Sequence, residues 1–287
     1  MEQIKIFIEL TRLNKPIGFF LLFWPCAWGV SLGYYFVGDI KLYLKYLILF
    51  FLGSVLMRSA GCIFNDIIDK DFDKKVDRTK GRPIASEKIS IFQSFLYVIF
   101  LCLIAFIILL QFNSLTVILG MSSMVFAFGY PFMKRITYWP QLFLGLTFNW
   151  GIIMGWTAIN NNISLEPIIL YFSAIFWTLG YDTIYGLQDV KDDEIIGVKS
   201  TSIKFKNNVK IFVGTCYSLC VFLILIMFYT MEINTYLLLL TVPFILSFIY
   251  QIKTFTVSSS KSCLLAFKHN NLTGLLIFIF IFSFNLL

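Results

Sequence analysis

The chain has 287 residues, of which 59% are hydrophobic, 18% aromatic and only 14% charged. A soluble globular protein has roughly 45–50% apolar and about 25% charged residues. This composition therefore excludes a disordered chain, a fibrous repeat and an ordinary cytosolic enzyme, and it predicts an integral membrane protein. The net charge of +7 fits basic cytoplasmic loops better than a nucleic-acid-binding domain, because too little polar sequence remains to build one.

The first segment, residues 1–15, has mixed charge and is typical of an interfacial amphipathic helix rather than a cleavable signal peptide. About nine apolar runs follow, each near the 20 residues that a spanning helix needs. They lie near residues 17–37, 44–64, 91–110, 114–132, 140–159, 165–186, 208–230, 234–251 and 270–287. The fold class we expect is an all-α membrane bundle. Because no transit-like leader is seen, the bacterial cytoplasmic membrane is favoured over an organelle.

The connections between these runs differ in charge from one side of the membrane to the other. Basic residues concentrate in 5–15, 70–88, 134–135, 191–210 and 253–268, whereas the alternate connections contain only Lys41 and Lys45. Since cytoplasmic loops are enriched in lysine and arginine, we expect the N-terminus on the cytoplasmic side. With nine spans, the C-terminus is then on the opposite side.

Acidic residues form two clusters, where the second and sixth spans end on the predicted cytoplasmic side. Within each cluster the polar residues recur every three or four positions, so they share one face of a helix. Like charges on one face repel, which indicates that something positive sits between the clusters. The members are Asn65, Asp69 and Asp73 in the first cluster, and Asp182, Tyr185, Asp189 and Asp193 in the second.

Carboxylate oxygens with open coordination positions suit Mg²⁺, which often binds shared between a protein and substrate phosphates. An EF-hand calcium loop starting at Asp69 is excluded, because Lys74 and Lys80 stand where that loop needs glycine and glutamate. Cations surround the acids, as expected for a metal-bound polyphosphate, and in a bilayer the natural substrate is a lipid diphosphate. These cations are Arg78, Lys80, Arg82, Lys134, Arg135 and Lys199.

The two clusters and their surroundings resemble the UbiA superfamily of intramembrane aromatic prenyltransferases. The similarity runs from about residue 9 to about residue 275, which implies one polytopic domain over residues 1–287. Further matching stretches are 12–18, 24–25, 57–62, 130–135 and 266–271. The resemblance implies nine helices around a central cavity that opens to lipid, with polyprenyl diphosphate and an aromatic acceptor as substrates and Mg²⁺ as cofactor. It indicates no nucleic-acid partner and no obligate protein partner.

The resemblance also implies roles for individual residues. The carboxylates that hold Mg²⁺ and diphosphate are Asp69, Asp73, Asp189 and Asp193, with Asn65 beside them. The cations that bind diphosphate are Arg78, Arg82 and Lys134, with Arg12 and Lys199 as further candidates.

Arg58 lies inside the second span, where an unpaired charge is costly. The resemblance implies that it receives the carboxylate of the aromatic acceptor, with Ser59 nearby; a buried ion pair or a side chain that reaches the interface is the alternative. Either Asp182 or Tyr185 could orient the phenol or help remove its proton. The lone histidine, His269, is expected to pack or hydrogen-bond at the start of the last span.

Two further features concern glycine. Glu87 stands where the family usually has glycine, in a loop that is expected to cap the cavity. Small residues allow helices to approach closely in membranes, and we expect this of Gly29, Gly33, Gly151 and Gly155.

Among the members of the superfamily, the motifs are most similar to those that prenylate 4-hydroxybenzoate. This implies Mg²⁺-dependent transfer of a polyprenyl group to the ring carbon ortho to the hydroxyl, an early step of ubiquinone biosynthesis. Other acceptors stay open, namely a naphthoate, homogentisate, haem or a glyceryl phosphate. A CDP-alcohol phosphotransferase is excluded because its Asp-Gly-x-x-Ala-Arg signature is missing. A cation-coupled transporter is a weaker alternative, since the acids lie at one membrane face.

Overall fold

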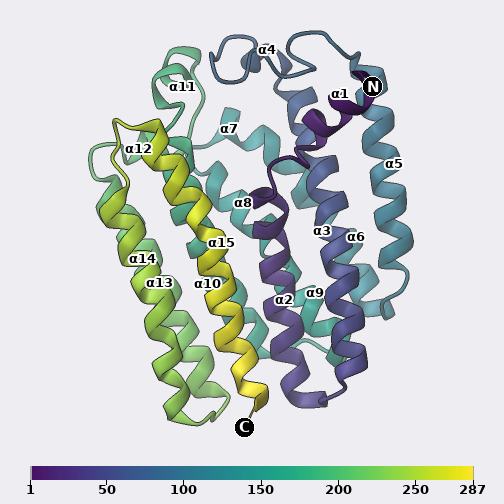
Figure 1. The fold of residues 1–287 in the computed structure, drawn as a ribbon, viewed down its shortest axis with the longest axis vertical. Helices are drawn as coiled ribbons and strands as arrows, with labels where there is room; N and C mark the ends of the chain where they lie inside the picture. The colour runs from purple at the N-terminus through teal and green to yellow at the C-terminus, as the bar shows by residue number, and fades with distance from the viewer. Residues whose placement is uncertain (1, 287) are drawn as a thin grey trace.

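The computed structural model describes residues 2–286. Within them, nine helical segments are long and apolar enough to cross a membrane. They run roughly parallel, and the N-terminus and C-terminus lie at opposite ends of the bundle (Figure 1). The prediction of an all-α membrane bundle is therefore confirmed.

Several spans are built from two or three helical pieces. The spanning elements are α2 (Ile17–Val37), α3 (Ile40–Ile68), α5 (Ile91–Leu109), α6 (Ser114–Gly129) continued by η1 (Tyr130–Phe132) and α7 (Met133–Ile136), α8 (Pro140–Phe148) with α9 (Trp150–Asn160), α10 (Leu165–Gly186), α13 (Val209–Thr230), η2 (Thr235–Thr241) with α14 (Val242–Thr254), and α15 (Ser260–Ser283) with η3 (Phe284–Leu286). The elements outside the spans are α1 (Glu2–Thr11), α4 (Lys70–Asp73), α11 (Val190–Ile196) and α12 (Thr201–Lys204). In Figure 1 these four lie at the same end of the bundle as the N-terminus.

Two spans begin earlier than the sequence predicts, by four and ten residues, and capping explains both. The second span begins at Ile40 rather than near 44, because the Asp39 side chain accepts hydrogen bonds from the first backbone amides of α3. The last span begins at Ser260 rather than near 270, because Ser259 caps α15 in the same way. His269 consequently lies well inside α15 rather than at its start, and its ring packs on Tyr250 with the ring centroids 4.8 Å apart.

Helices α2 and α9 pack in backbone contact through glycine. A Cβ atom added to Gly29 would lie 2.1 Å from the Ile152 carbonyl oxygen, and one added to Gly155 would lie 2.5 Å from the Cys26 carbonyl oxygen. No side chain fits at these distances, so the prediction that these glycines permit close helix contact is confirmed. This contact lies behind the cavity described below and sets the position of one of its walls.

A buried hydrogen-bond network ties α10, α14 and α15 together. The Trp177 indole N–H donates to the Asn270 side-chain oxygen (2.8 Å), and the Asn270 amide donates to the Gln251 side-chain oxygen (2.8 Å). All three side chains are fully buried. Because buried polar groups must be satisfied internally in a membrane protein, this network fixes the angle between the helices that carry it.

We expect Asn270→Leu to destabilise the protein markedly. The substitution keeps the volume but leaves the Trp177 N–H without a partner, and such a buried group costs about 1–3 kcal/mol. The Gln251 oxygen loses one of its two donors and keeps the Tyr217 hydroxyl (2.9 Å). Thermal unfolding in detergent measures the loss. Asn162→Leu is the matched control, because Asn162 also accepts an indole N–H, from Trp156 (3.0 Å), but is itself exposed. Equal losses in the two variants would contradict this account of the network.

Candidate active site

Two cavities meet at the end of the bundle that carries the short helices. The larger one, the central cavity, has a volume of about 1500 Å³ and is lined by side chains of α2, α3, α5, α6, α8, α9, α10 and α15. The smaller one, the polar pocket, has a volume of about 180 Å³. Tyr130 and Asp182 line both, so the two cavities share a wall.

The central cavity extends through much of the membrane. Phe50 and Asp66 of α3 both line it, and sixteen helical residues correspond to about 24 Å, compared with a hydrocarbon core of about 30 Å. Its wall includes Leu103 of α5 and Met121 of α6, which are 57% and 50% exposed. Apolar side chains of α5 and α6 with at least half of their surface exposed therefore form part of the cavity wall.

The polar pocket brings together most of the residues that the sequence singles out. Both acidic clusters reach it because α3 and α10 end at the same level and continue, after a short break, into α4 and α11. The predicted residues that line it are Asn65, Asp69, Asp73, Arg78, Arg82, Lys134, Asp182, Asp189, Asp193 and Lys199. Arg12, Arg58 and Tyr185 line the adjoining central cavity.

The regular helix face predicted for each cluster is interrupted. Asp69 lies in a break between α3 and α4 with φ −93° and ψ 5°, although the Asn65 amide still donates to its carboxylate (2.9 Å). Asp189 lies in a similar break before α11, where the preceding turn is tightened. Because of these breaks, the last aspartate of each acidic cluster, Asp73 or Asp193, lies against the polar pocket.

Three of the four predicted metal carboxylates are paired with three of the predicted diphosphate cations. Arg78 forms a two-point ion pair with Asp189, Lys134 pairs with Asp69, and Arg82 pairs with Asp73 (2.8 Å). These pairs join the loop after α4 to the start of α11 and to α4 itself, and they join α7 to the break before α4. These three acids and three cations thus neutralise one another pairwise.

Asp66 is a site residue that the sequence reasoning missed. It is 2% exposed and accepts hydrogen bonds from Arg12 (2.6 Å) and Arg82 (3.0 Å). Arg12 has a left-handed backbone, with φ 54°, which lets the chain turn between α1 and α2 while its side chain reaches Asp66. The neighbouring ladder residues obscured this role, because Asp66 lies off the face that they share.

Burial also changes the acidity of the pocket. Burial raises the pKa of Asp193 to about 6, and the neighbouring Asp189 adds to this effect. Burial likewise raises the pKa of Asp73, while Arg82 opposes the shift. Both carboxyl groups therefore hold a proton more readily than exposed ones.

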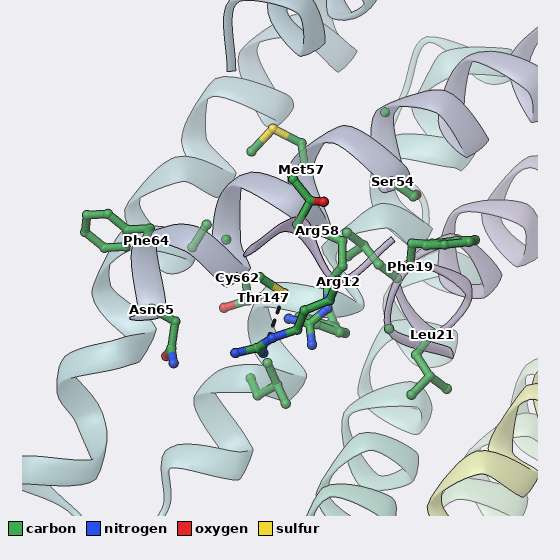
Figure 2. A pocket seen from close by; sticks show the side chains of 18 of the residues that line it. Arg12, Phe19, Leu21, Ser54, Met57, Arg58, Cys62, Phe64, Asn65 and Thr147 are labelled. Atoms are coloured by element: carbon green, nitrogen blue, oxygen red, sulfur yellow. Dashed lines mark hydrogen bonds between the residues drawn. The ribbon is translucent and has the colours of Figure 1, made fainter. Parts of the chain in front are cut away.

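Arg58 faces the central cavity without an ion pair in the described part of the chain. Its guanidinium lies 5.4 Å from the Phe148 ring centroid, and its Nε atom is buried without a hydrogen-bond partner. Figure 2 shows Arg12 and Arg58 reaching into this cavity, with Asn65 farther along the helix of Arg58. The structure does not bring Ser59 to this place: it is buried, lines neither cavity, and donates to the Val55 carbonyl (2.7 Å).

Two other predicted residues lie at the margin of the site. The Tyr185 hydroxyl accepts a hydrogen bond from Arg78 (3.1 Å). The Lys199 ammonium donates to the Ile136 carbonyl (3.1 Å) rather than to a carboxylate, and its backbone amide donates to the Lys134 carbonyl (2.9 Å). Lys199 thereby links the segment after α11 to α7.

Glu87 lies in the loop that carries Arg78 and Arg82, and it adopts the left-handed conformation, with φ 61°. Glycine adopts this conformation without strain, which accounts for the glycine of the family pattern. Here Glu87 forms an exposed ion pair with Lys74 (2.7 Å).

We expect Glu87→Gly to be more stable than Glu87→Ala, the reverse of the usual order. Both variants lose the ion pair, but only the alanine keeps a Cβ atom in a left-handed backbone. The difference in melting temperature should be about 2 °C. A higher melting temperature for Glu87→Ala would show that the loop relaxes out of this conformation.

The pocket fits a divalent cation by its chemistry. Within residues 2–286, no group of three or more aspartate, glutamate, histidine or cysteine side chains forms a ready metal site, because the carboxylates are held by arginine and lysine. However, the Asp69 Oδ1 atom is buried without a hydrogen-bond partner. Its nearest cation is the Arg135 guanidinium at 3.9 Å, beyond hydrogen-bond distance. A buried carboxylate oxygen without a hydrogen bond is costly, and a metal cation bound to it would offset that cost.

A helical membrane bundle with a charged pocket beside a lipid-sized cavity is typical of an intramembrane enzyme. Comparison with known proteins identifies the family. Residues 22–272 match the family described as the UbiA prenyltransferase family, and the chain belongs to this family. It is 47% identical over 211 residues, 73% of its length, to the Arabidopsis thaliana protein named 4-hydroxybenzoate polyprenyltransferase, mitochondrial. It is 48% identical over 207 residues, 71% of its length, to the Homo sapiens protein of the same name.

These alignments cover 51% and 55% of the two relatives, so the chain spans about half the length of the curated relatives it matches. Solved structures share the fold. A UbiA homologue from Aeropyrum pernix superimposes with a TM-score of 0.77 at 22% identity, over 92% of this chain and 97% of that one. A UbiA homologue from Archaeoglobus fulgidus, bound to GPP and Mg²⁺, gives 0.74 at 15% identity, over 98% and 100%.

Proposed function

We propose that this chain, as a single domain, transfers a polyprenyl group from polyprenyl diphosphate to the ring carbon ortho to the hydroxyl of 4-hydroxybenzoate. The product is 3-polyprenyl-4-hydroxybenzoate, an early intermediate of ubiquinone biosynthesis. The observation that carries this proposal is the junction of the two cavities. A pocket rich in acids and cations adjoins an apolar chamber about as deep as the bilayer core. The names of the relatives favour 4-hydroxybenzoate as the acceptor.

The diphosphate head group is held in the polar pocket in this proposal. Mg²⁺, held by the four aspartates with Asn65 beside them, would neutralise charge on the diphosphate as it leaves. The A. fulgidus homologue binds GPP and Mg²⁺, which supports this arrangement. The cations that contact the phosphate oxygens are Arg78, Arg82, Lys134, Arg12 and Lys199.

The reaction is an exchange of one bond for another at C1 of the prenyl donor. The C1–O bond breaks and its electron pair stays on the diphosphate oxygen, while the ring carbon ortho to the hydroxyl forms a bond to C1. The ring hydrogen then leaves as a proton and aromaticity returns. Arg58 holds the carboxylate of the acceptor, and Asp182 or Tyr185 orients its phenol.

The test is prenyl transfer in membranes that contain this chain, with radiolabelled 4-hydroxybenzoate, geranyl diphosphate and Mg²⁺. We expect label to appear in a lipid-soluble product, and none when EDTA is present. Parallel reactions contain a naphthoate or homogentisate. Prenylation of only one of these other acceptors would agree with a prenyltransferase of this family but would contradict 4-hydroxybenzoate as its acceptor. Inactivity with every acceptor and with longer donors would favour a transporter.

The location and orientation are also proposals. The basic connections lie at the end of the bundle that carries the polar pocket, so we infer that the pocket and the N-terminus face the cytoplasm in a bacterial cytoplasmic membrane. The curated relatives named above are mitochondrial proteins. Cysteine labelling from either side of right-side-out vesicles, at Lys80→Cys, tests the orientation.

We expect the Mg²⁺ requirement to rise steeply in acid. The pKa of Asp193 is raised to about 6 by burial and by Asp189, so below that pH the carboxyl holds a proton that Mg²⁺ must displace. The Mg²⁺ concentration for half-maximal activity should increase by up to about tenfold per pH unit below 6. It should change less steeply in Asp193→Asn. A flat dependence between pH 5 and 7 in the parent enzyme would contradict the prediction.

A further inference from the structure

Asp66 holds two arginine side chains with a single carboxylate oxygen. Its Oδ1 atom accepts hydrogen bonds from Arg12 (2.6 Å) and from Arg82 (3.0 Å), and the same Arg82 nitrogen also donates to Asp73 (2.8 Å). The Asp66 side chain is 2% exposed, whereas those of Arg12 and Arg82 are 23% and 20% exposed. The acid is therefore buried, while both arginines keep accessible surface and line the central cavity.

Asp66 differs in position from the four aspartates that are predicted to hold Mg²⁺. Those four all line the polar pocket, whereas Asp66 lines only the central cavity. Because Arg82 is bound to Asp66 as well as to Asp73, a ligand that takes Asp73 still leaves Arg82 with one acid. We therefore separate Asp66 from the predicted metal ligands.

The two arginines come from segments that do not by themselves fix their side chains. Arg12 lies in the link between α1 and α2, and Arg82 lies in the loop between α4 and α5. A long side chain there has many rotamers, and it loses this freedom when it binds a ligand. Asp66 instead lies on α3, and Cys62, one turn earlier on the same helix, gives Arg12 a second contact (3.7 Å; Figure 2). The helix thus provides a rigid support for both guanidinium groups.

By its charge alone, Asp66 opposes the binding of a diphosphate, because a carboxylate repels phosphate oxygens. Its removal also has an effect of the opposite sign. Two guanidinium groups that share one oxygen repel each other, and within residues 2–286 Asp66 is the only acid that pairs with Arg12. Without Asp66 the two cations separate. The sign of the change in diphosphate affinity therefore distinguishes repulsion from positioning.

We propose that Asp66 is a positioning residue, which holds Arg12 and Arg82 side by side so that both guanidinium groups bind the diphosphate of the prenyl donor. This inference rests on the proposed function and adds the residue that arranges its cations. Arg82 lines both cavities and Arg12 lines the central one, so the pair lies where the head group would join the prenyl chain. Cations that are ordered before the ligand arrives bind it more tightly, because less freedom is lost on binding.

The test measures the binding of geranyl diphosphate, with Mg²⁺ and without acceptor, to the full chain in detergent. We expect the Kd to rise about tenfold in Asp66→Asn, the factor that a hydrogen bond to a charged group provides. In an Arg12→Gln background the same substitution should change the Kd by less than about threefold, since only one arginine is left to hold.

Two controls separate positioning from general damage. Geraniol has the same chain but no diphosphate, so it should bind equally to the parent and to Asp66→Asn. Asp77→Asn also removes a carboxylate that pairs with a cation, Lys80 (2.6 Å), but Asp77 is exposed and lines neither cavity. Its affinity for geranyl diphosphate should equal that of the parent.

The outcomes separate this inference from the proposed function. If the parent does not bind geranyl diphosphate, the proposed function fails and the inference fails with it. If the parent binds it and Asp66→Asn binds it equally or more tightly, only the role of Asp66 fails. The same loss in the parent and in the Arg12→Gln background would also overturn that role, because the two residues would then act independently. Weaker binding of geraniol in Asp66→Asn would overturn it too.

A second variant keeps the inference testable if Asp66→Asn does not fold. Asp66→Glu keeps the charge but moves the carboxylate by one methylene group. Weaker binding of geranyl diphosphate in this variant supports positioning, because only the geometry of the carboxylate has changed. Binding equal to that of the parent contradicts it.

Discussion

Replacement of Asp69 by asparagine is expected to reduce prenyl transfer by a factor of at least about 10³. Asp69 is 2% exposed, binds Lys134 and Asn65 through one oxygen, and leaves its other oxygen buried without a hydrogen bond. A neutral amide cannot supply that second oxygen as an anionic ligand, and losing one preorganised electrostatic group typically costs 10²–10³ in rate. Losing a metal as well enlarges the effect. Single-turnover transfer at saturating Mg²⁺ measures it.

Asp71→Asn is the control for this experiment. Asp71 lies two residues further along, in the short helix α4, but it is exposed and does not line the polar pocket. The Asp71→Asn substitution removes one negative charge from the same region, so any general effect of charge on activity appears in both variants. Activity in Asp69→Asn within tenfold of that in Asp71→Asn would remove Asp69 from the metal site.

Arg58→Met should lower kcat/KM for 4-hydroxybenzoate by about 10²- to 10³-fold without destabilising the protein. Truncating one partner of a buried charged hydrogen-bonded pair costs about 2–5 kcal/mol, and the acceptor's carboxylate would lose its partner. The folded protein without ligand loses the contact with Phe148 and the packing beside Gly18, but no ion pair within the described residues. Because an unpaired charge in a membrane helix is unfavourable, the melting temperature should stay the same or rise.

A neutral acceptor distinguishes this role from general damage to the cavity. 4-Hydroxyacetophenone keeps the phenol but has no carboxylate, so its binding should be equally weak in Arg58→Met and in the parent enzyme. The KM for geranyl diphosphate should not change in the variant. A large rise in that KM would assign Arg58 to the diphosphate instead.

The sequence predicts the spans well where apolar periodicity alone defines them. It fails at α15, where the first ten residues mix polar and apolar side chains and the start depends on the cap at Ser259. It also fails at Asp69 and Asp189, where the four-residue spacing indicates continuous helix but the chain breaks. A break of this kind depends on ion pairs with distant segments, such as that between Asp189 and Arg78, and spacing along the chain carries no information about them.

The same limit explains which site residues the sequence missed. Asp66 acquires its importance from its partners in the folded protein, Arg12 and Arg82. It does not stand out by type or spacing beside the two acidic clusters. Ser59 is the opposite case, since its position next to Arg58 in the chain predicts it for the site. Consecutive residues of a helix point in different directions, and the Ser59 side chain bonds the backbone of α3 instead. The motifs thus predict the class of reaction, whereas contacts in the folded protein decide which neighbouring residues line the site.

If the proposed function holds, the pairing of pocket acids with pocket cations couples the binding of metal to the binding of diphosphate. A metal ion that takes Asp189 would release Arg78, and one that takes Asp73 would leave Arg82 with Asp66 alone; a diphosphate that takes those arginines would release the aspartates. Each ligand thus removes the competitor of the other, and by thermodynamic reciprocity the gain in affinity is the same in both directions. Metal alone or lipid diphosphate alone would have to break these ion pairs, whereas the two bound together would supply a new partner to both members of each pair.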